Sequence, residues 1–390
     1  MNRLGLLPRI IIAVLLGLLF GQFMPYAIVR IFATFNGVFS QFLGFLIPLI
    51  IVGLVTPAIS EVGSGAGKLL AMTVLIAYID TTIAGLLAYS TGSLLFPSMV
   101  ETAQAAPLVE QSAEISPYFV VTIPSMIDVM SALLFSFVVG LAVAYMPRLT
   151  TLRSIAFEFR QIVIKTIEIS IIPLLPLYIF GIFLMMTVSG QAYHILLVFA
   201  KIIIVIFLLH IFILLYEFII AGAVAGKNPF RLLWTMLPAY ATALGTSSSA
   251  ATIPVTLKQT LKNGVSEGIA GFTVPLCATV HMSGSAMKIT ACALTICLLH
   301  GLPHDFPTFF HFIGMLGLVM VASPGVPGGA IMACLGILAS ILSFTPDQQA
   351  LMIALYIAMD SFGTACNVTG DGAIAVIIDK YYHPASASQP

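Results

Sequence analysis

The chain has 390 residues, of which 60% are hydrophobic and 8% are charged, with 15 basic and 15 acidic side chains. A soluble globular domain carries about 25% charged residues, so this composition excludes a disordered chain, a nucleic-acid binder with a basic face and an ordinary soluble enzyme. The apolar runs are continuous rather than alternating, which favours membrane-spanning helices over barrel strands. We therefore expect an all-α integral membrane protein whose surroundings are a lipid bilayer.

The predicted spans follow one another along the chain, separated by short polar segments. A span needs about 20 apolar residues to cross the bilayer core. Arg3 and Arg9 precede the first apolar run, but no convincing small-residue cleavage site follows, so we interpret this run as a retained helix rather than a signal peptide. The first six predicted spans are 9–25, 31–57, 69–96, 122–146, 160–187 and 193–225.

The second half of the chain has a different pattern. In residues 229–262 and 306–344, two short apolar halves flank a polar interruption, and each stretch precedes a span, at 268–299 and 347–380. If both interrupted stretches are re-entrant hairpins, the Lys and Arg residues of the loops stay on one side, as the positive-inside rule requires. The predicted fold is therefore eight transmembrane helices plus two re-entrant helical hairpins, with both termini in the cytoplasm.

The two hairpin-plus-span units have opposite orientations, which indicates inverted repeats. Paired broken hydrophobic segments in inverted halves mark the binding site of secondary transporters. Unwound backbone at membrane depth exposes N–H and C=O groups, which are tolerated only where they line a cavity or bind a ligand. We expect the two spans that follow the hairpins to be broken at His281–Gly284 and at Asn367–Asp371.

The last span carries a stripe of polar residues. Asp360, Thr364, Asn367 and Asp371 are spaced i, i+4, i+7 and i+11, which places them on one face of a helix. Two carboxylates at membrane depth are costly and must face partners. We expect the stripe to bind cations and ammonium groups; the alternative is a pair of structural polar anchors between helices.

Polar side chains in the sixth span have a simpler interpretation. We interpret Lys201, His210 and Glu217 as interhelical or interfacial groups rather than as ligands, because long polar side chains can reach the membrane surface.

Four segments, in this order, resemble the signature segments of the dicarboxylate/amino acid:cation symporters, the glutamate-transporter family. They are Ser247–Thr256, Pro275–Gly284, Gly325–Gly328 and Asn367–Asp371. The resemblance covers residues 229–380 and extends more weakly over the first six spans. It implies a homotrimer with an elevator-type mechanism, located in the bacterial inner membrane, with a small-molecule substrate and no cofactor other than a coupling ion.

The resemblance also implies that the chain is divided into a scaffold and a moving transport domain. Residues 1–68 and 122–190 would hold scaffold helices 1–2 and 4–5. Residues 69–97 would form helix 3 of the transport domain and residues 98–121 an extracellular loop. Residues 191–390 would complete the transport domain with helix 6, hairpin 1, helix 7, hairpin 2 and helix 8.

Roles carry over from the family residue by residue. Asp360 would bind the α-ammonium group of the substrate, Asn367 its α-carboxylate, and Asp371 one sodium ion, while a second sodium site would consist largely of backbone carbonyls. The expected substrate-binding residues are Ser248, Ser249, Val326, Gly328, Asp360, Gly363, Thr364 and Asn367. The expected sodium ligands are Cys277, Thr279, His281, Met282, Val321, Ser323, Asn367 and Asp371.

Departures from the family pattern change the expected chemistry. Members that take acidic substrates have an arginine where this chain has Gly363, and Ser247 does not replace that arginine. A side-chain carboxylate would find no partner there, so we expect a small neutral amino acid as substrate. Ser283 stands in place of the aspartate of a third sodium site, and His281 in place of its asparagine, so fewer sodium sites are expected.

Two unusual charges, Asp80 and Lys288, lie near this altered site. We hypothesise that Lys288 supplies a tethered positive charge in place of one sodium, paired with Asp80 or another nearby carboxylate, and that it shares a helix face with His281 and Ser285. The alternatives are proton coupling through Asp80 and His281 and a static Asp80–Lys288 pair. The coupling candidates are Tyr78, Asp80, Thr81, Thr82, Ser283 and Lys288.

Together these patterns predict a sodium-coupled symporter that imports a small neutral amino acid, and not an enzyme. A proton-coupled amino acid or dicarboxylate carrier of the same fold is the alternative. Tyr78–Asp80 and Gly370–Asp371 superficially resemble the paired motifs of an intramembrane aspartyl protease. That distant alternative leaves both hairpins and the repeat unexplained. A channel is a further alternative, but paired re-entrant gates favour alternating access.

Overall fold

The structure is a computed structural model that describes residues 6–63, 67–104, 115–146, 148–190, 192–321, 323 and 328–382. Val326 and part of the predicted 98–121 loop lie outside these residues. Within them every regular element is a helix, which confirms the all-α prediction. The elements are α1 (Leu6–Phe20), α2 (Tyr26–Gly63), α3 (Gly67–Gln104), α4 (Val129–Tyr145), α5 (Thr150–Thr166), the π-helical turn η1 (Ile167–Ile171), α6 (Ile172–Val188), α7 (Ala192–Ala225), α8 (Pro229–Thr246), α9 (Ser249–Lys262), α10 (Glu267–Val280), α11 (Ser283–His300), α12 (Phe306–Val321), α13 (Gly329–Leu342), α14 (Pro346–Ala358) and α15 (Asp360–Tyr381).

Long apolar helices make this a multi-pass membrane protein. Among the described residues, six helical segments are long and apolar enough to cross a membrane, judged by length and composition. α1, α4, α12 and α13 contain shorter apolar helices. The six longer segments are Tyr26–Ser60, Lys68–Val100, Thr150–Val188, Ile195–Ala225, Glu267–His300 and Asp360–Tyr381.

The predicted end of the third span is wrong. α3 continues to Gln104, into the segment predicted as a loop from residue 98. The sequence from Ser98 to Gln104 contains Met, Glu, Ala and Gln. These residues favour helix even where the chain is no longer strongly apolar, so the hydropathy pattern ended before the helix did.

Both interrupted stretches fold as two helices that pack against each other. α8 packs against α9, and α12 packs against α13. The first pair reverses direction at Ser247, which has a left-handed backbone with φ of 50°, and Ser248 then caps α9 by accepting a hydrogen bond from the Ala251 N–H. The chain turns where the sequence placed its run of serines.

The span after the first helix pair breaks at His281 and Met282, between α10 and α11, within the predicted His281–Gly284 segment. His281 therefore caps α10 and does not share a helix with Ser285 and Lys288, which corrects the expected three-residue face. The break predicted at Asn367–Asp371 is also wrong.

Asn367–Asp371 lies inside α15, and the chain instead interrupts at Met359, between α14 and α15. The polar residues of this segment form a side-chain face on an intact helix rather than an unwound backbone. The expected stripe of Asp360, Thr364, Asn367 and Asp371 does lie on this one helix.

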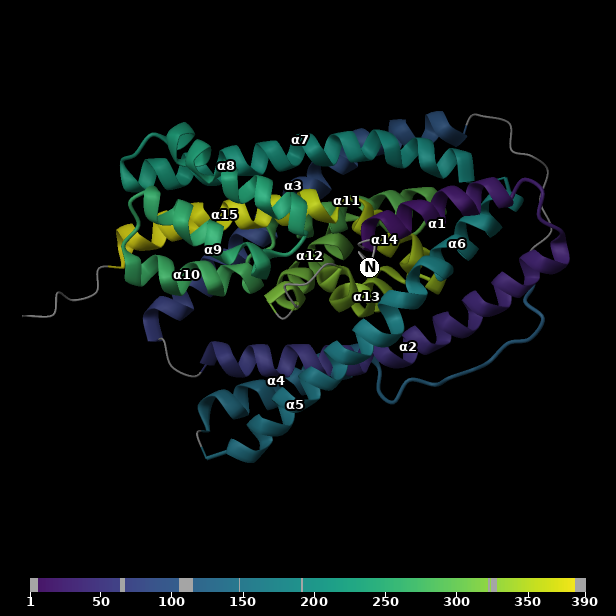
Figure 1. Cartoon of the computed structure of the whole chain (residues 1–390), viewed down its shortest axis with the longest axis horizontal. Coiled ribbons are helices and arrows are strands. Elements are labelled where there is room, and N and C mark those ends of the chain that lie inside the picture. Colours follow the sequence, from purple (N-terminus) through teal and green to yellow (C-terminus); the bar gives the residue numbers. More distant parts are fainter. Residues whose placement is uncertain are drawn as a thin grey trace, which may run out of the picture.

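The helices form two packed groups, one of which surrounds the C-terminal helix α15. α2 packs against α4, α5 and α6, and α1 packs against α6. α15 packs against α7, α8, α9, α10 and α11, and α11 packs against α3. Figure 1 shows α7 and α8 along one side, α4 and α5 on the opposite side, and the helices from α9 to α15 between them.

The centre of this arrangement is almost closed to solvent. Every residue of α11 from Ser283 to Cys297 is buried. Polar side chains on α11 and α15 must therefore find partners inside the protein.

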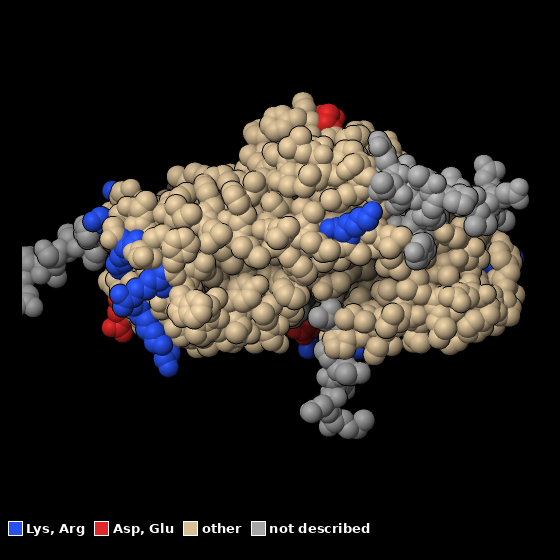
Figure 2. Space-filling view, turned by 90° about the horizontal axis from the view of Figure 1, so that it is seen from above, with Lys and Arg blue, Asp and Glu red and all other residues tan. Residues whose placement is uncertain are grey.

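On the face shown in Figure 2, basic side chains gather at one end, and only a few scattered charges lie along the rest of that face. That end holds the turns between α7 and α8 and between α9 and α10 (Figure 1). The exposed basic residues of these turns and of the last turn of α15 are Lys227, Arg231, Lys258, Lys262 and Lys380.

α1 approaches α6 through a glycine, which gives a test of this packing. A Cβ at Gly17 would lie 2.8 Å from the Phe180 carbonyl oxygen and 2.9 Å from the Phe183 Cβ, whereas a Cβ at Gly37 of α2 would meet no atom within 4 Å. We expect Gly17→Ala to destabilise the protein by about 1–3 kcal/mol, because α6 must move. Gly37→Ala should be neutral or stabilising by up to about 1 kcal/mol. Thermal unfolding of the purified variants checks this, and equal midpoints would contradict the close approach.

Candidate functional site

Each helix pair has a tip where the chain passes from its first helix to its second. Both tips, the helix-pair ends, lie against the first turn of α15. The Ser247 hydroxyl at the turn of the first pair lies 2.6 Å from the Ser361 hydroxyl. The Gly328 N–H, at the start of α13, donates to Asp360 Oδ2 at 2.9 Å. Both interrupted stretches are thus tied to neighbouring residues of one helix, beside the break at Met359.

Asp360 forms a buried ion pair with Lys288. Lys288 Nζ lies 3.1 Å from Asp360 Oδ1, and the two side chains are 0% and 7% exposed. The ammonium group also lies 3.5 Å from the centre of the Tyr356 ring, where a cation–π contact adds to the stabilisation. The hypothesis left the partner of Lys288 open between Asp80 and another nearby carboxylate, and the structure pairs it with Asp360, because its side chain points from α11 towards the start of α15.

Gly363 leaves the space that Lys288 occupies. A Cβ at this position would lie 2.7 Å from Lys288 Nζ and 2.9 Å from Lys288 Cε. Members of the similar family that take acidic substrates carry an arginine at position 363. Here the cation beside that position is Lys288, which comes from α11. In this structure Asp360 neutralises the charge of Lys288.

Asn367 joins α15 to the start of α11. Its Oδ1 accepts hydrogen bonds from the N–H groups of Gly284 at 2.9 Å and Ser285 at 3.2 Å, and its Nδ2 donates to the Ser285 hydroxyl at 3.0 Å. The Ser285 hydroxyl in turn lies 3.1 Å from the Tyr356 hydroxyl. The amide thus satisfies the N–H groups that a helix start leaves without partners.

The break between α10 and α11 places the His281 ring between two carboxylates. Nε2 lies 2.9 Å from Asp80 Oδ2 on α3, and Nδ1 lies 3.0 Å from Asp371 Oδ1 on α15. Glu217 of α7 is close as well, with its Oε1 at 3.9 Å from Nε2. The Ser283 hydroxyl donates to that same Glu217 oxygen at 2.8 Å.

Hydrogen bonding fixes the proton content of this cluster. An ionised carboxylate can only accept, whereas a neutral imidazole has one donor and one acceptor nitrogen. His281 bonds to a carboxyl group through each nitrogen, so either the ring is an imidazolium or one carboxyl group is protonated. In both cases the group holds one proton more than a neutral imidazole and two carboxylates would.

If all three carboxyl groups were ionised, the cluster would be negative even with an imidazolium. Uncompensated charge away from water costs several kcal/mol, so the site favours further cations or protons. Ligand atoms of Asp80, Glu217 and His281 all lie within 4.8 Å of one another and could hold a metal ion.

Glu217 is the site residue that the sequence interpretation missed. The sequence pattern favours an interhelical role for it, yet it is buried and meets Ser283, the residue in place of the third-site aspartate. A Cβ at Gly370 would collide with the Glu217 carboxylate, so a glycine on α15 makes room for it. The available signal was a carboxylate in a segment of mean hydropathy 3.0. His210, by contrast, bonds to the Gly284 carbonyl at 3.0 Å, as an interhelical group does.

The other coupling candidates on α3 differ in what they contact. The Thr81 hydroxyl accepts from the Met282 N–H at 3.2 Å, inside the α10–α11 break. Tyr78 instead donates to the Gly314 carbonyl of α12 at 3.2 Å, and Thr82 bonds back to its own helix at the Tyr78 carbonyl at 2.8 Å.

The residues expected to form the second sodium site are brought together only in part. The Ser323 hydroxyl lies 3.0 Å from Met282 Sδ, which joins the end of α12 to the α10–α11 break. Thr279 Oγ1 donates to the Leu276 carbonyl within its own helix at 2.9 Å. Val321 is the last residue of α12, and Cys277 is buried in α10, where its carbonyl accepts from the His281 N–H.

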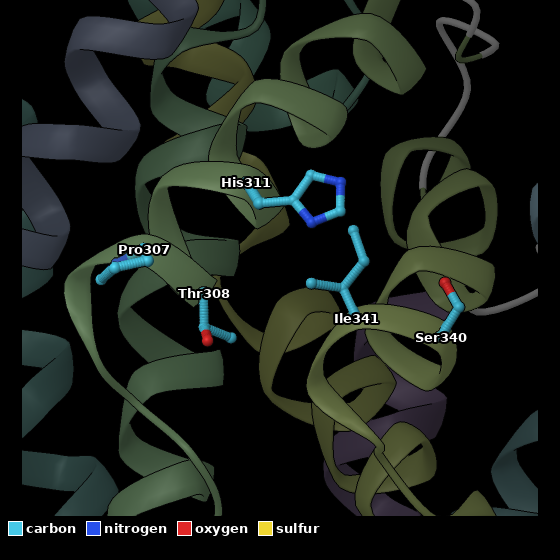
Figure 3. Close-up of a pocket in the computed structure, with 5 residues that line it drawn as sticks. All are labelled: Pro307, Thr308, His311, Ser340 and Ile341. Carbon is cyan, nitrogen blue, oxygen red and sulfur yellow. The ribbon is translucent and has the colours of Figure 1, made fainter.

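A cavity of about 440 Å³ lies elsewhere, between α12 and α13. Figure 3 shows its lining on these two helices, and none of the expected site residues contributes to it. The lining residues are Pro307, Thr308, His311, Ser340 and Ile341.

Comparison with known proteins adds independent information. The model of the sodium:dicarboxylate symporter family matches residues 6–381. The neutral amino acid transporter B(0) of Rattus norvegicus is 35% identical over 156 residues, which are 40% of this chain and 28% of that protein. Its Homo sapiens counterpart is 33% identical over 156 residues, 40% of this chain and 29% of that protein.

A relative named for excitatory rather than neutral amino acids matches as well. The excitatory amino acid transporter 5 of Homo sapiens is 32% identical over 166 residues, 42% of this chain and 29% of that protein. The matched part thus covers less than a third of each of these relatives.

Removing the shared imidazole gives a test of the cluster. We expect His281→Ala to destabilise the protein by about 3–5 kcal/mol, because Asp80 and Asp371 lose the group that both contact. Thr273→Val, on the same α10, is the matched control: its buried hydroxyl has no hydrogen-bond partner among the described residues, so its loss should be nearly neutral. Thermal unfolding in detergent compares the two. A His281→Ala variant as stable as Thr273→Val would contradict the cluster.

Proposed function

The chain belongs to the sodium:dicarboxylate symporter family, and on that premise we propose that it is a secondary active symporter that imports a small neutral amino acid. One observation carries the proposal: both helix-pair ends converge on Asp360 and Ser361, beside a buried carboxylate paired with an ammonium group. This is a family of symporters, not of enzymes. The protease alternative is also disfavoured because His281 lies between the carboxyl groups of Asp80 and Asp371.

The amino acid would bind between the helix-pair ends and α15. Asp360 accepts its ammonium group, and its carboxylate lies near Asn367 and the N-terminus of α9, where free N–H groups and the helix dipole favour an anion. Ser248, Ser249, Thr364 and Gly328 complete this surface. No arginine stands at position 363 to pair with a side-chain carboxylate, which supports a neutral substrate. The name of the B(0) relatives points the same way.

Sodium would be the coupling ion, at fewer sites than in the family pattern. The negative charge around Asp371 supports binding of a cation there, with backbone carbonyls of Cys277, His281 and Asn367 as neutral ligands. The second site would combine Thr279 and Met282 with Val321 and Ser323 at the end of α12.

A proton is the second candidate for the coupling ion. The observation that favours it is the bonding of His281 to a carboxyl group at each ring nitrogen. That arrangement stores a proton where the family pattern would place a sodium. Proton and sodium coupling then differ in which gradient drives uptake.

The remaining family properties extend the proposal. The packing of α1, α2, α4, α5 and α6 together supports a scaffold, and the packing of α3 and α7–α11 around α15 supports a transport domain that moves in an elevator-type cycle. A homotrimer in the bacterial inner membrane, with both termini in the cytoplasm, completes the proposed arrangement.

Uptake into proteoliposomes under one imposed gradient at a time tests the function and the coupling ion together. We expect accumulation of one or a few small neutral amino acids when sodium is high outside, with saturation that separates a carrier from a channel. Accumulation under an inward proton gradient without sodium would identify the proton instead. Uptake of acidic amino acids alone would contradict the neutral-substrate assignment, and no uptake under either gradient would contradict symport.

Glu217 provides a variant that probes the ion site. We expect Glu217→Gln to weaken the apparent affinity for the driving cation by at least about tenfold, because a unit charge about 4 Å away contributes about 4 kcal/mol at an effective dielectric constant of 20. Glu158→Gln, on an exposed part of α5, is the control. Uptake is measured against ion concentration for both variants. Identical ion dependence would remove Glu217 from the site.

A further inference from the structure

Asp360 holds several elements together, and it does so with Lys288 as its counter-charge. One carboxylate oxygen accepts from the Gly328 N–H at the start of α13, and the other contacts Lys288 Nζ of α11. Asp360 itself opens α15 after the Met359 break. A buried carboxylate is costly without a cation, so the attachment of α13 to α15 depends on an ammonium group at this position.

The fold around the pair is shaped for the lysine. The Lys288 side chain is fully buried, and its ammonium group lies over the Tyr356 ring. The only residue type that leaves room for Nζ at position 363 is glycine, because a Cβ would lie 2.7 Å away. The Lys288 side chain therefore fills a buried space that depends on the glycine at position 363.

The substrate of the proposed function carries the same chemical group. A lysine side chain and an α-amino acid each present a primary ammonium, a compact charge with three N–H donors. Both would need the same Asp360 oxygen, so they compete for it. When the amino acid is absent, Lys288 already satisfies that oxygen, and the Gly328 bond is present at the same time.

We propose that Lys288 is an internal substitute for the ammonium group of the substrate: it occupies Asp360 while the site is empty and is displaced when an amino acid binds. This inference rests on the proposed function and deepens it. The empty protein then reaches the same compact arrangement of α13 on α15 as the loaded protein. It does so without binding another cation, such as potassium, for the return step. It can therefore return empty, so the carrier performs net uptake and not exchange alone.

This role differs from a replacement for sodium. The altered ion site is built around His281, with Asp80 on one ring nitrogen and Asp371 on the other. Lys288 is bonded to Asp360 instead, beside the ends of both helix pairs. Its charge is therefore placed to act on substrate binding and on the empty state.

The test compares two transport modes in proteoliposomes. Net uptake starts with no amino acid inside, and exchange starts with unlabelled amino acid inside. We expect Lys288→Met to lower the ratio of net uptake to exchange at least about tenfold, because the empty form loses its counter-charge. Its apparent substrate affinity should rise at least about tenfold, because the competing ammonium is gone. Thr295→Val, also buried on α11, is the control and should change neither quantity.

Two further measurements keep the outcome decisive if Lys288→Met does not fold. Gly363→Ala retains the charge of Lys288, but its Cβ would force Nζ away from Asp360. It should therefore also lower the ratio of net uptake to exchange. The wild-type protein should perform net uptake with no exchangeable cation, such as potassium, inside the vesicles. Unchanged ratios in both variants, or wild-type protein restricted to exchange, would overturn the role of Lys288. Wild-type protein that moves no amino acid in either mode would instead overturn the proposed function, and the inference with it.

Discussion

An ionised group away from water must be compensated by another charge or by hydrogen bonds, and this constraint governs the whole interior of the protein. With 8% charged residues in 390, the chain places few charges inside. Those that it does bury meet one another across helices rather than along them. The carboxylates are Asp80, Glu217, Asp360 and Asp371, and the side chains that meet them are His281 and Lys288.

These contacts divide the centre of the molecule into two sites that share one helix. At the start of α15, Asp360 and Ser361 receive the ends of both helix pairs. About three turns further along, Asp371 meets the His281 ring in the α10–α11 break. Asn367 lies between them and holds the start of α11. Substrate and coupling ion would therefore act on the same rigid helix, which gives a physical route for their coupling.

Much of the architecture could be predicted because its signals are local. Continuous apolar runs identified the long helices, the serine run identified the turn after α8, and an i, i+4, i+7, i+11 spacing identified the polar face of α15. The break at Met359 could not be predicted, because the polar residue beside it, Asp360, fits the spacing of the polar face of α15. Asn367–Asp371 is polar as well and contains Gly370, but its side chains find partners on other helices, and the backbone stays helical.

The partners of the buried charges could not be predicted either, because they depend on how distant helices pack. The sequence leaves the partner of Lys288 open between Asp80 and another nearby carboxylate, and only the packing shows that its side chain reaches Asp360 through the space left by Gly363. Glu217 was overlooked because nothing near it in the sequence indicates that Ser283 and His281 approach α7. A glycine in one helix and a charge in another are a signal only when the two helices are known to touch.

The most direct measurement of the central claim is a pair of experimental structures in lipid nanodiscs, one without substrate and one with a transported amino acid, at a resolution that shows side chains. The account predicts the Lys288–Asp360 contact in the empty protein. In the loaded protein, the substrate ammonium group should lie against Asp360 and Lys288 should have moved away. An intact Lys288–Asp360 pair with the amino acid bound would contradict the account.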